Sequence, residues 1–336
     1  MTIRQTTARD RVSVVVVGHN NWPDLSLAIA SALHQSHEPV EVIVVDNAST
    51  DETPRAVQER FGDAVRYLRQ PRNLFDGGGY NAGVRAASGE FVQFLDADDF
   101  LAPDKIELQL RTFRDHPDAD IVRGSYRRYQ VTPGRADWED RDLPQTGDVL
   151  TTLIRDDCAA AGLLVHNVLF RRRALEKIGP WDEEIVGVDL DYFLRAAWSG
   201  CRFADCPAAL CFYQVRPGQM STVRHTQRRN REKTLAKALS YVTTEPHRTV
   251  LTNKLAWFRF YDALSSGTLP RGERMAKLRA AAKGRSGLRS RISFGLGWCL
   301  IQVPGASTLL DVDALHAVRT TAAAILGIRP RRQELQ

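Results

Sequence analysis

Short apolar runs alternate with amphipathic stretches over the first two hundred residues of the chain. The runs are rich in Val, Ile, Leu and Phe, and they occupy residues 12–17, 42–45, 65–68, 91–95 and 165–170. Continuous runs of this kind are typical of strands that are buried on both faces of a sheet. Strands that alternate with helices indicate βαβ units, so the pattern predicts an α/β fold with a mostly parallel sheet flanked by helices.

The segments between the runs carry the start signals of helices, including prolines that fit a first helical turn. The expected helices cover residues 23–35, 53 onward, 80–87, 103–115 and 187–199, and three glycines at 77–79 stand before the third of them. Residues 126–151 contain prolines and many charges, which predicts a long surface loop. Beyond Thr226 the pattern is helical and basic.

Carboxylates follow two of the expected strands directly. Asp96, Asp98 and Asp99 come after the run at 91–95, and Asp46 comes after the run at 42–45. The carboxyl ends of parallel strands meet at one edge of a sheet, where α/β proteins bind their ligands. Like charges this close repel, so we expect a divalent cation with phosphate oxygens among them. On spacing alone, helix capping by the three acids explains the pattern equally well.

Charge is distributed unevenly along the chain, whose net charge is +6. Residues 224–336 contain 21 Lys and Arg against 7 Asp and Glu, whereas residues 1–223 contain 25 and 33. The back third therefore carries +14 and the front part −8, which indicates two segments with different partners. We expect a domain at residues 11–223 and a mainly helical, basic segment at residues 224–336.

The cysteines and the N-terminal residues indicate the cellular compartment of the protein. The five cysteines form no C-x-x-C pair, which fits a reduced protein better than a disulfide scaffold. Residues 1–11 are polar and contain no apolar core, so no signal peptide is visible. We therefore expect a cytoplasmic protein.

The order of the motifs along the chain resembles family 2 glycosyltransferases, which have the Rossmann-like GT-A fold. The motifs are Val12 to Asn20, Val45 to Asp51, Asn81 to Glu90, Leu95 to Asp99, Gly179 to Glu183, Val188 to Asp191 and Pro217 to Ser221. This ordered combination covers roughly residues 11–223 and is far more specific than any single motif.

The resemblance implies an inverting glycosyltransferase of cell-wall or polysaccharide biosynthesis. Such an enzyme moves a sugar from a nucleotide-diphosphate sugar, here expected to be of the UDP or dTDP type, to an acceptor hydroxyl. The acceptor would be a glycan, a lipid-linked intermediate or a small natural product. The basic residues 224–336 lie outside the resemblance.

The resemblance also implies roles for individual residues. Asp98 would hold Mg²⁺ or Mn²⁺ on the diphosphate, and Asp189 would be the general base that takes a proton from the acceptor hydroxyl. Without the resemblance, capping of a helix start is the preferred interpretation of Asp189. The residues implied in nucleotide binding are Gly18, His19, Asn20, Asp46, Asn47 and Asp96.

Three positions depart from the family pattern. Val188 and Tyr80 stand where an acid and an arginine are common, and Arg216 replaces a histidine. Arginine cannot bind the metal, but its guanidinium can clamp a phosphate as a fixed cation. The further candidates for phosphate or acceptor contacts are Arg216, His166, Asn167 and Asp191.

The C-terminal third contains an apolar stretch, Ile292 to Val303, among arginines. It is too short to span a membrane. Basic residues beside an aromatic apolar patch can hold a helix at a lipid surface. The alternatives are a lid on the catalytic domain and a contact in a homo-oligomer, because an apolar stripe is more often core than anchor.

Two alternative functions follow from the same residues. The departures from the family pattern fit a catalytically degenerate module that binds a nucleotide sugar without turnover. The basic C-terminal third fits a nucleic-acid-binding protein, but it resembles no known nucleic-acid motif and basic charge alone is weak evidence. We therefore expect no nucleic-acid partner.

Overall fold

The computed structural model describes residues 10–132, 135–143, 148–216, 219, 224–265, 272, 273, 275–277 and 279. The chain divides into two compact units, Met1–Asn230 and Arg231–Gln336. The boundary between them falls inside a helix, seven residues after the end of the expected domain at residue 223. The functional division at 223/224 stays a prediction.

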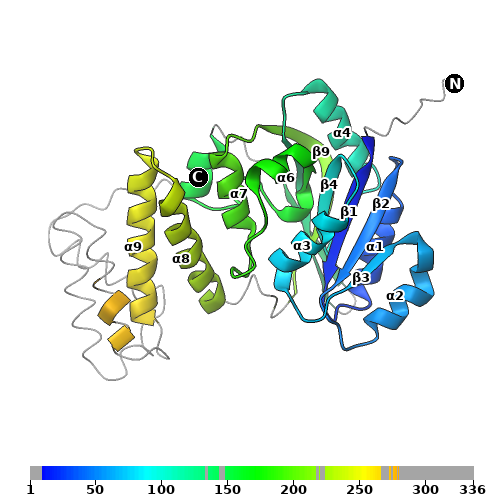
Figure 1. Cartoon of the computed structure of the whole chain (residues 1–336), viewed down its shortest axis with the longest axis horizontal. Helices are drawn as coiled ribbons and strands as arrows, with labels where there is room; N and C mark the ends of the chain where they lie inside the picture. The colour runs from blue at the N-terminus through cyan, green and yellow to red at the C-terminus, as the bar shows by residue number, and fades with distance from the viewer. Residues whose placement is uncertain are drawn as a thin grey trace. The chain divides into compact units, whose positions relative to one another are not determined.

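Strands alternate with helices through the first unit (Figure 1). The strands are β1 (Val12–Gly18), β2 (Val40–Asp46), β3 (Arg66–Arg69), β4 (Phe91–Asp96), β5 (Phe100–Leu101), β6 (Ile121–Thr132), β7 (Arg135–Arg141), β8 (Val168–Arg171) and β9 (Phe203–Gln214). The helices before residue 200 are α1 (Asp24–Leu33), α2 (Thr53–Phe61), α3 (Phe75–Ala86), α4 (Lys105–Asp115), α5 (Val149–Arg155), α6 (Arg172–Ile178) and α7 (Asp189–Trp198), with 3-10 turns at Gly62–Ala64 and Val165–Asn167. The predicted α/β class is confirmed.

In the described part of the chain the strands form one nine-stranded sheet, in the order β3-β2-β1-β4-β8-β6-β9-β5, with β7 beside β6. The pairs β2–β3, β1–β2 and β1–β4 are parallel. By contrast, β8 runs antiparallel to both β4 and β6. The long strands β6 and β9 also pair in parallel, and because β8 reverses between β4 and β6 they run in the same direction as β4. The sheet is therefore mixed but mostly parallel, as predicted.

The direction of β8 matters for the site. Because β8 is antiparallel to β4, its first residue lies toward the carboxyl end of β4, where Gln93 pairs with Leu169. The turn Val165–Asn167, which leads into β8, consequently lies at the same edge of the sheet as the acids that follow β4. No pattern in the sequence predicts this reversal.

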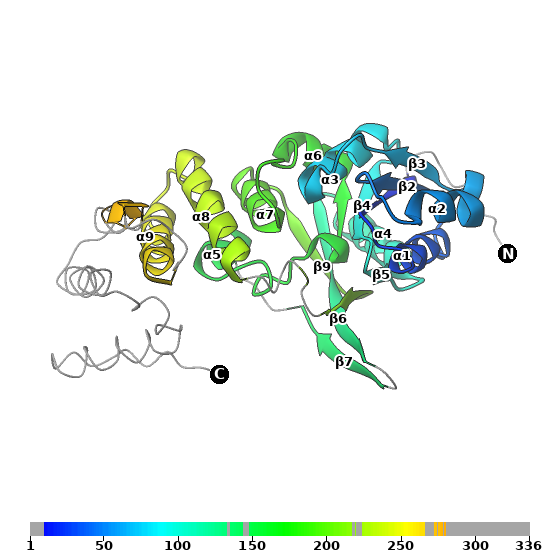
Figure 2. The ribbon, with the colours of Figure 1, turned by 90° about the horizontal axis from the view of Figure 1, so that it is seen from below.

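The prediction of a surface loop at residues 126–151 is wrong over most of that range. Ile121–Thr132 and Arg135–Arg141 pair as the antiparallel strands β6 and β7 of a hairpin, which extends beyond the rest of the sheet in Figure 2. Its many charges are paired across the two strands, as in Arg127 with Asp140 and Arg128 with Glu139. Opposite charges at facing positions stabilise such a hairpin, so charge here does not indicate a loop.

Helices cover both faces of the parallel strands. Val14 and Val16 of β1 belong to a buried cluster that includes side chains of α1 and α4. On the opposite face, α3 packs so closely that a Cβ at Gly83 would lie 2.1 Å from Cγ1 of Val15, and one at Gly79 would lie 2.5 Å from Cγ1 of Val17. Residues 77–79 are therefore part of helix α3 and not a loop before it, because glycine permits this approach of helix and strand.

The second unit contains most of α8 (Arg224–Tyr241) and α9 (His247–Ser265). Arg259 and Lys277 both pair with Glu232, with N–O distances of 3.1 and 2.7 Å. Within the described residues, no helix is both long and apolar enough to cross a membrane. The apolar stretch Ile292 to Val303 lies outside the described residues, so its predicted membrane, lid or oligomer contacts stay predictions.

Candidate active site

The carboxyl ends of β1, β2 and β4 meet at one edge of the sheet. The register pairs Gly18 with Asp46 and Val17 with Asp96. The backbone N–H of Asn47 donates to the carbonyl oxygen of Gly18 at 2.8 Å, which ties the loop after β2 to the end of β1. The motifs that sequence analysis singled out are thus brought together.

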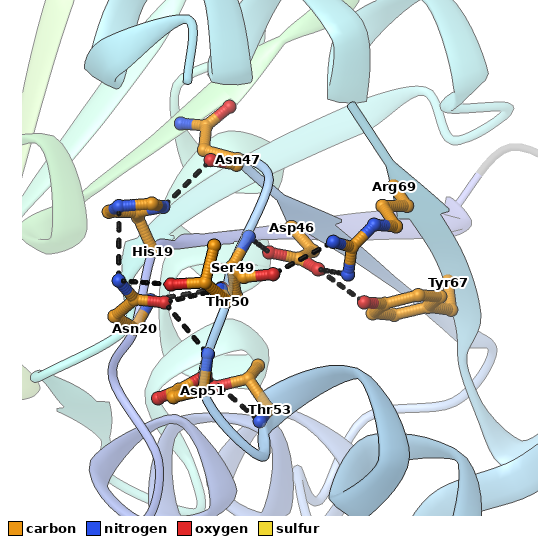
Figure 3. Close-up of polar contacts among 10 residues, drawn as sticks. All are labelled: His19, Asn20, Asp46, Asn47, Ser49, Thr50, Asp51, Thr53, Tyr67 and Arg69. Carbon is orange, nitrogen blue, oxygen red and sulfur yellow. Dashed lines mark hydrogen bonds and ion pairs between the residues drawn. The ribbon is translucent and has the colours of Figure 1, made fainter. Parts of the chain in front are cut away.

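Asp46 lies in the centre of a polar network (Figure 3). Its Oδ1 accepts from the backbone N–H of Ser49 at 2.8 Å, and its Oδ2 accepts from the Tyr67 hydroxyl and from Nη1 of Arg69 at 3.2 Å. Burial, and then Asp46 itself, raises the pKa of Tyr67, so the phenol stays a donor. The Asp46 side chain has no exposed surface, whereas Arg69 is 46% exposed. Contact of Asp46 with a nucleobase stays a prediction.

His19 and Asn20 hold the loop after β2 from the other side (Figure 3). Nδ1 of His19 lies 2.8 Å from the carbonyl oxygen of Asn47. Oδ1 of Asn20 accepts from the backbone N–H groups of Thr50 and Asp51 at 2.7 and 3.3 Å. Asn20 itself is exposed and has a φ of 53°, a conformation that asparagine adopts more readily than most residues.

Asn47 connects this loop to helix α3. Its side-chain Nδ2 donates to the carbonyl oxygen of Phe75 at 2.9 Å. Phe75 begins α3 with a φ of 54° and its side chain is 49% exposed. Asn47 itself is buried, so its amide acts here as a bridge between two elements.

The three acids after β4 have different partners. Asp96 accepts from the hydroxyl of Tyr80, and burial together with the Asp99 carboxylate raises the pKa of Asp96. Asp99 is 1% exposed, and its Oδ2 lies 2.9 Å from Nδ1 of His166, which is 2% exposed. Burial alone would lower the pKa of His166, but Asp99 outweighs it and raises that pKa well above the usual value. The two form an ion pair at the floor of the site.

Asp98 faces a different cation. Nη2 of Arg216 pairs with Oδ2 of Asp98, and Nη1 of the same guanidinium lies 2.9 Å from Oδ2 of Asp24 in the first turn of α1. The Asp98 side chain is 25% exposed, far more than that of Asp99. The positive charge of Arg216 therefore lies beside Asp98, at the place where a metal ion was predicted.

One group of side chains in the described part of the chain has the spacing of metal ligands. Asp96, Asp99 and His166 each offer one atom, and these atoms lie within 4.8 Å of one another. Carboxylate oxygens and imidazole nitrogen suit Mn²⁺ and related cations. Asp98, the predicted ligand, is not a member of this group, so its role stays a prediction.

Asp189 is the first residue of helix α7 (Asp189–Trp198). Burial, and after it the Asp76 carboxylate, raises the pKa of Asp189 to about 6. Its carboxylate also accepts from the backbone of Val165. A carboxylate with a pKa close to neutrality is suited to general base catalysis.

Asp76 is a member of this site that sequence analysis missed. It lies in the first turn of α3, and its carboxylate acts electrostatically on Asp98, Tyr80 and Asp189. Burial raises its pKa, whereas a backbone hydrogen bond with Gly187 opposes that shift. Acidic residues are favoured in a first helical turn, but this signal was hidden because the helix was expected to begin at residue 80, after the glycines that follow Asp76.

Two of the predicted contact residues have structural roles. Asn167 is fully buried, and its Nδ2 donates to the carbonyl oxygens of Gly124 and Gly162 at 2.7 and 3.0 Å. Asp191 is also fully buried and pairs with Nε of Arg195 one turn later at 2.9 Å. Burial and these partners hold both side chains inside the protein, and their contact with a phosphate or an acceptor stays a prediction.

Comparison with known proteins agrees with this geometry. The sequence model described as glycosyl transferase family 2 matches residues 13–179. The succinoglycan biosynthesis protein ExoO of Rhizobium meliloti is 33% identical over 226 residues, which are 63% of this chain and 63% of ExoO. An uncharacterized glycosyltransferase of Nostoc is 31% identical over 51% of this chain and 54% of its own length. Chondroitin synthase of Escherichia coli is 28% identical over 68% of this chain and 32% of that protein.

These relatives are longer than the matched region, and the chain spans about one third to two thirds of their lengths. Among solved structures, S. aureus TarS 1–349 in complex with UDP-GlcNAc has a TM-score of 0.65 at 17% identity, covering 96% of this chain and 93% of that chain. The mannosyltransferase PcManGT from Pyrobaculum calidifontis, in complex with GDP-Man and Mn²⁺, has a TM-score of 0.56 at 20% identity, covering 95% and 88%. At these identities the likeness establishes the fold.

Proposed function

Since this chain belongs to glycosyl transferase family 2, we propose that it transfers a sugar from a nucleotide-diphosphate sugar to an acceptor hydroxyl and inverts the anomeric centre. One observation carries the proposal. Asp189, a half-buried carboxylate with a pKa raised to about 6, lies in the electrostatic field of Asp76 and Asp99. A single displacement at a sugar carbon requires such a carboxylate on the face of the sugar opposite the leaving diphosphate.

The donor nucleotide binds at the edge where β1 and β2 end. Gly18, His19, Asn20 and Asn47 line this edge, and Arg69 offers an exposed guanidinium beside the buried Asp46. We take UDP or dTDP as the nucleotide, and Asp96 as the partner of the ribose. TarS, which has the same fold, binds UDP-GlcNAc.

Asp189 acts as the general base. Its carboxylate accepts the proton of the acceptor hydroxyl while the acceptor oxygen forms a bond to the anomeric carbon of the sugar. The bond from that carbon to the diphosphate oxygen breaks, and the nucleoside diphosphate leaves with the electron pair. A positioned base contributes roughly 10²- to 10⁴-fold to such a reaction.

A divalent cation, Mg²⁺ or Mn²⁺, fits the acids after β4. Hard cations of this kind are bound by one or two carboxylates together with substrate phosphates. Asp98 is the ligand that a diphosphate can reach, because it is 25% exposed and Asp99 and His166 are buried in their own ion pair. When bound, the cation would stabilise negative charge on the leaving diphosphate. Arg216 holds positive charge at the same place.

The acceptor is proposed to be a glycan. Succinoglycan biosynthesis and chondroitin synthase appear in the names of the similar proteins, and both names refer to polysaccharides. A lipid-linked intermediate or a natural product offers the same reacting hydroxyl.

Calorimetric titration with UDP, dTDP and GDP, with and without Mn²⁺, tests donor binding. We expect one nucleotide to bind, and no binding by any of the three would refute the proposal. Turnover of the corresponding sugar nucleotide then tests catalysis. Asp189→Asn should lose roughly 10²- to 10⁴-fold in turnover while it still binds the nucleotide, and the matched variant Glu184→Gln, at an exposed residue before α7, should keep it. Turnover that survives in Asp189→Asn removes the proposed base.

A further inference from the structure

Four aromatic side chains gather on one face of the sheet where β5, β6, β7 and β9 meet. This aromatic platform consists of Phe100, Tyr129, Trp138 and Phe212. The rings of Phe100 and Phe212 are stacked at 4.3 Å between centroids, and those of Tyr129 and Trp138 at 5.4 Å. Trp138 also meets Phe212 edge-on at 5.9 Å. Trp138 is nevertheless 51% exposed.

The strand register explains why the four rings share a face. Trp138 pairs with Tyr129 across the hairpin, and Phe100 pairs with Phe212. Tyr129 lies two residues after Arg127, which pairs with Phe212. Paired residues and residues two apart point to the same side of a sheet, so the strand register by itself brings the four rings of the platform together.

The platform continues directly from the proposed active site. The hydroxyl of Tyr129 donates to the backbone carbonyl oxygen of Asp98 at 3.2 Å. Phe100 follows Asp99 in the sequence and begins β5. The exposed Trp138 ring is therefore separated from the acids after β4 by one tyrosine side chain.

A charged pair borders the exposed ring. The guanidinium of Arg127 lies 6.0 Å from the centre of the Trp138 ring and pairs with Asp140, which is 65% exposed. A purely apolar partner would leave these two ions without water, which is costly. A ligand with an apolar face and a rim of hydroxyl groups suits the ring and the ions together.

We infer that Trp138 and the aromatic platform bind a sugar unit of the acceptor glycan, whose C–H face lies on the indole while its hydroxyls meet Arg127 and Asp140. This inference rests on the proposed function and names the acceptor subsite. Aromatic rings give a large contact area at a small loss of conformational freedom. The Trp138 ring is held by Tyr129 and Phe212, so this loss is smaller still.

Calorimetric titration of the full chain with cellotetraose, chitotetraose and a chondroitin tetrasaccharide, without donor, tests the inference. We expect at least one of them to bind the wild type, Trp138→Ala to bind it about tenfold more weakly, and Trp138→Phe to retain most of the affinity, since burial of an aromatic face accounts for about this factor. Leu27→Ala is the matched control, because Leu27 is a 50% exposed apolar side chain on α1.

Equal affinity of Trp138→Ala and the wild type would overturn the inference, as would an absence of binding to all three tetrasaccharides. The molar mass of the wild type and of the same variants in solution is a second measurement. A dimer that Trp138→Ala dissociates would also overturn the inference, since the ring would then be a contact between copies of the chain. The proposed function fails separately, if no nucleotide binds the wild type.

Discussion

Arg216 and Asp98 form an ion pair at the centre of the acidic edge, and the same guanidinium also pairs with Asp24. A cation that uses Asp98 as a ligand must therefore compete with an arginine that belongs to the chain. Arg216 comes from the segment after β9, whereas Asp98 follows β4, so only the folded chain creates this competition.

Replacement of Arg216 should strengthen metal binding. In Arg216→Gln the carboxylates of Asp98 and Asp24 lose their counter-ion, and we expect the Kd for Mn²⁺ in the absence of nucleotide to fall roughly fivefold, about 1 kcal/mol for a partly exposed ion pair. Titration of Mn²⁺ followed by electron paramagnetic resonance measures this change. Arg202→Gln, which removes an exposed ion pair with Asp118, should not change the Kd. An unchanged Kd in Arg216→Gln would show that Arg216 and the metal do not share Asp98.

The pH dependence of turnover should follow the pKa of Asp189, which the charge of Asp76 helps to raise. The ionised carboxylate is the active form of the base, so kcat/KM should rise with pH up to about 6, the pKa of Asp189, and level off above it. Below pH 6 it should fall about tenfold per pH unit. In Asp76→Asn one of the charges that raise this pKa is absent, and the acidic limb should move to lower pH, while burial keeps part of the shift. If the acidic limb of the pH profile does not move in Asp76→Asn, then Asp76 does not raise the pKa of Asp189.

Loss of Arg69 should destabilise the fold as well as the nucleotide site. Asp46 has no exposed surface, and without Arg69 its charge keeps only the Tyr67 hydroxyl and the Ser49 N–H as partners. We expect Arg69→Ala to lower the free energy of unfolding by about 2 kcal/mol, because buried charge is left less compensated. Urea denaturation measures the loss, with the exposed Arg72→Ala as a control that changes little. Equal stability of the two variants would contradict this account of Asp46.

Close packing of α3 on β1 should make Gly83 intolerant of any side chain. A Cβ there would meet Cγ1 of Val15 at 2.1 Å, and Gly83→Ala should cost about 1–3 kcal/mol of unfolding free energy through overpacking. Val15→Ala in the same chain makes room for the new methyl group. The double variant should therefore lose less stability than the sum of the two single losses. Strict additivity in urea denaturation would mean that Val15 is not the obstacle.

Lys105 should make stability depend on alkaline pH. It is fully buried, its ammonium group donates to Gln93 and Gln109, and burial lowers its pKa from 10.5 to about 8. Between these values the unfolded chain binds more protons than the folded one, so stability rises with pH in this window. Relative to Lys105→Met, the wild type should gain roughly 3 kcal/mol of unfolding free energy from pH 7 to above 10.

The control for this prediction is Lys177→Met, which replaces a lysine with a 41% exposed side chain. Its difference from the wild type should stay nearly constant over the same range. Unfolding free energies from urea titrations at pH 7 and pH 10 provide the comparison. A constant difference for Lys105→Met as well would mean that Lys105 keeps an ordinary pKa in the fold.

The elements that local sequence determines were predicted well. Strands β1, β2 and β4 are buried on both faces, so burial alone selects their Val, Ile, Leu and Phe residues. The hairpin of β6 and β7 and the long strand β9 were missed, because their alternate residues are charged or half-exposed and find their partners only across the sheet. Helix α3 was predicted to begin too late, since Gly77 and Gly79 are chosen by close contact with Asp182 and Val17 and not by helix propensity.

The same distinction applies to the candidate site. Asp46, Asp96, Asp98 and Asp189 were singled out because each ends a strand, follows one closely or begins a helix within a recognisable motif. Their partners Arg69, Tyr80, Arg216 and Asp24 act through contacts with residues 16 to 192 positions away in the chain. Such long-range pairings leave no periodic pattern in the sequence. They nevertheless determine which carboxylate is available to bind a ligand.

Asn47 has a consequence for any attempt to change the donor specificity of this chain. Its carbonyl oxygen faces His19, and its amide nitrogen holds the start of α3, the helix that carries Asp76. The loop that would recognise the nucleobase is therefore fastened by one residue to the helix whose Asp76 raises the pKa of Asp189, the proposed general base. Redesign of the first will displace the second, so a change of nucleotide preference at this loop requires compensating substitutions in α3 to preserve the rate.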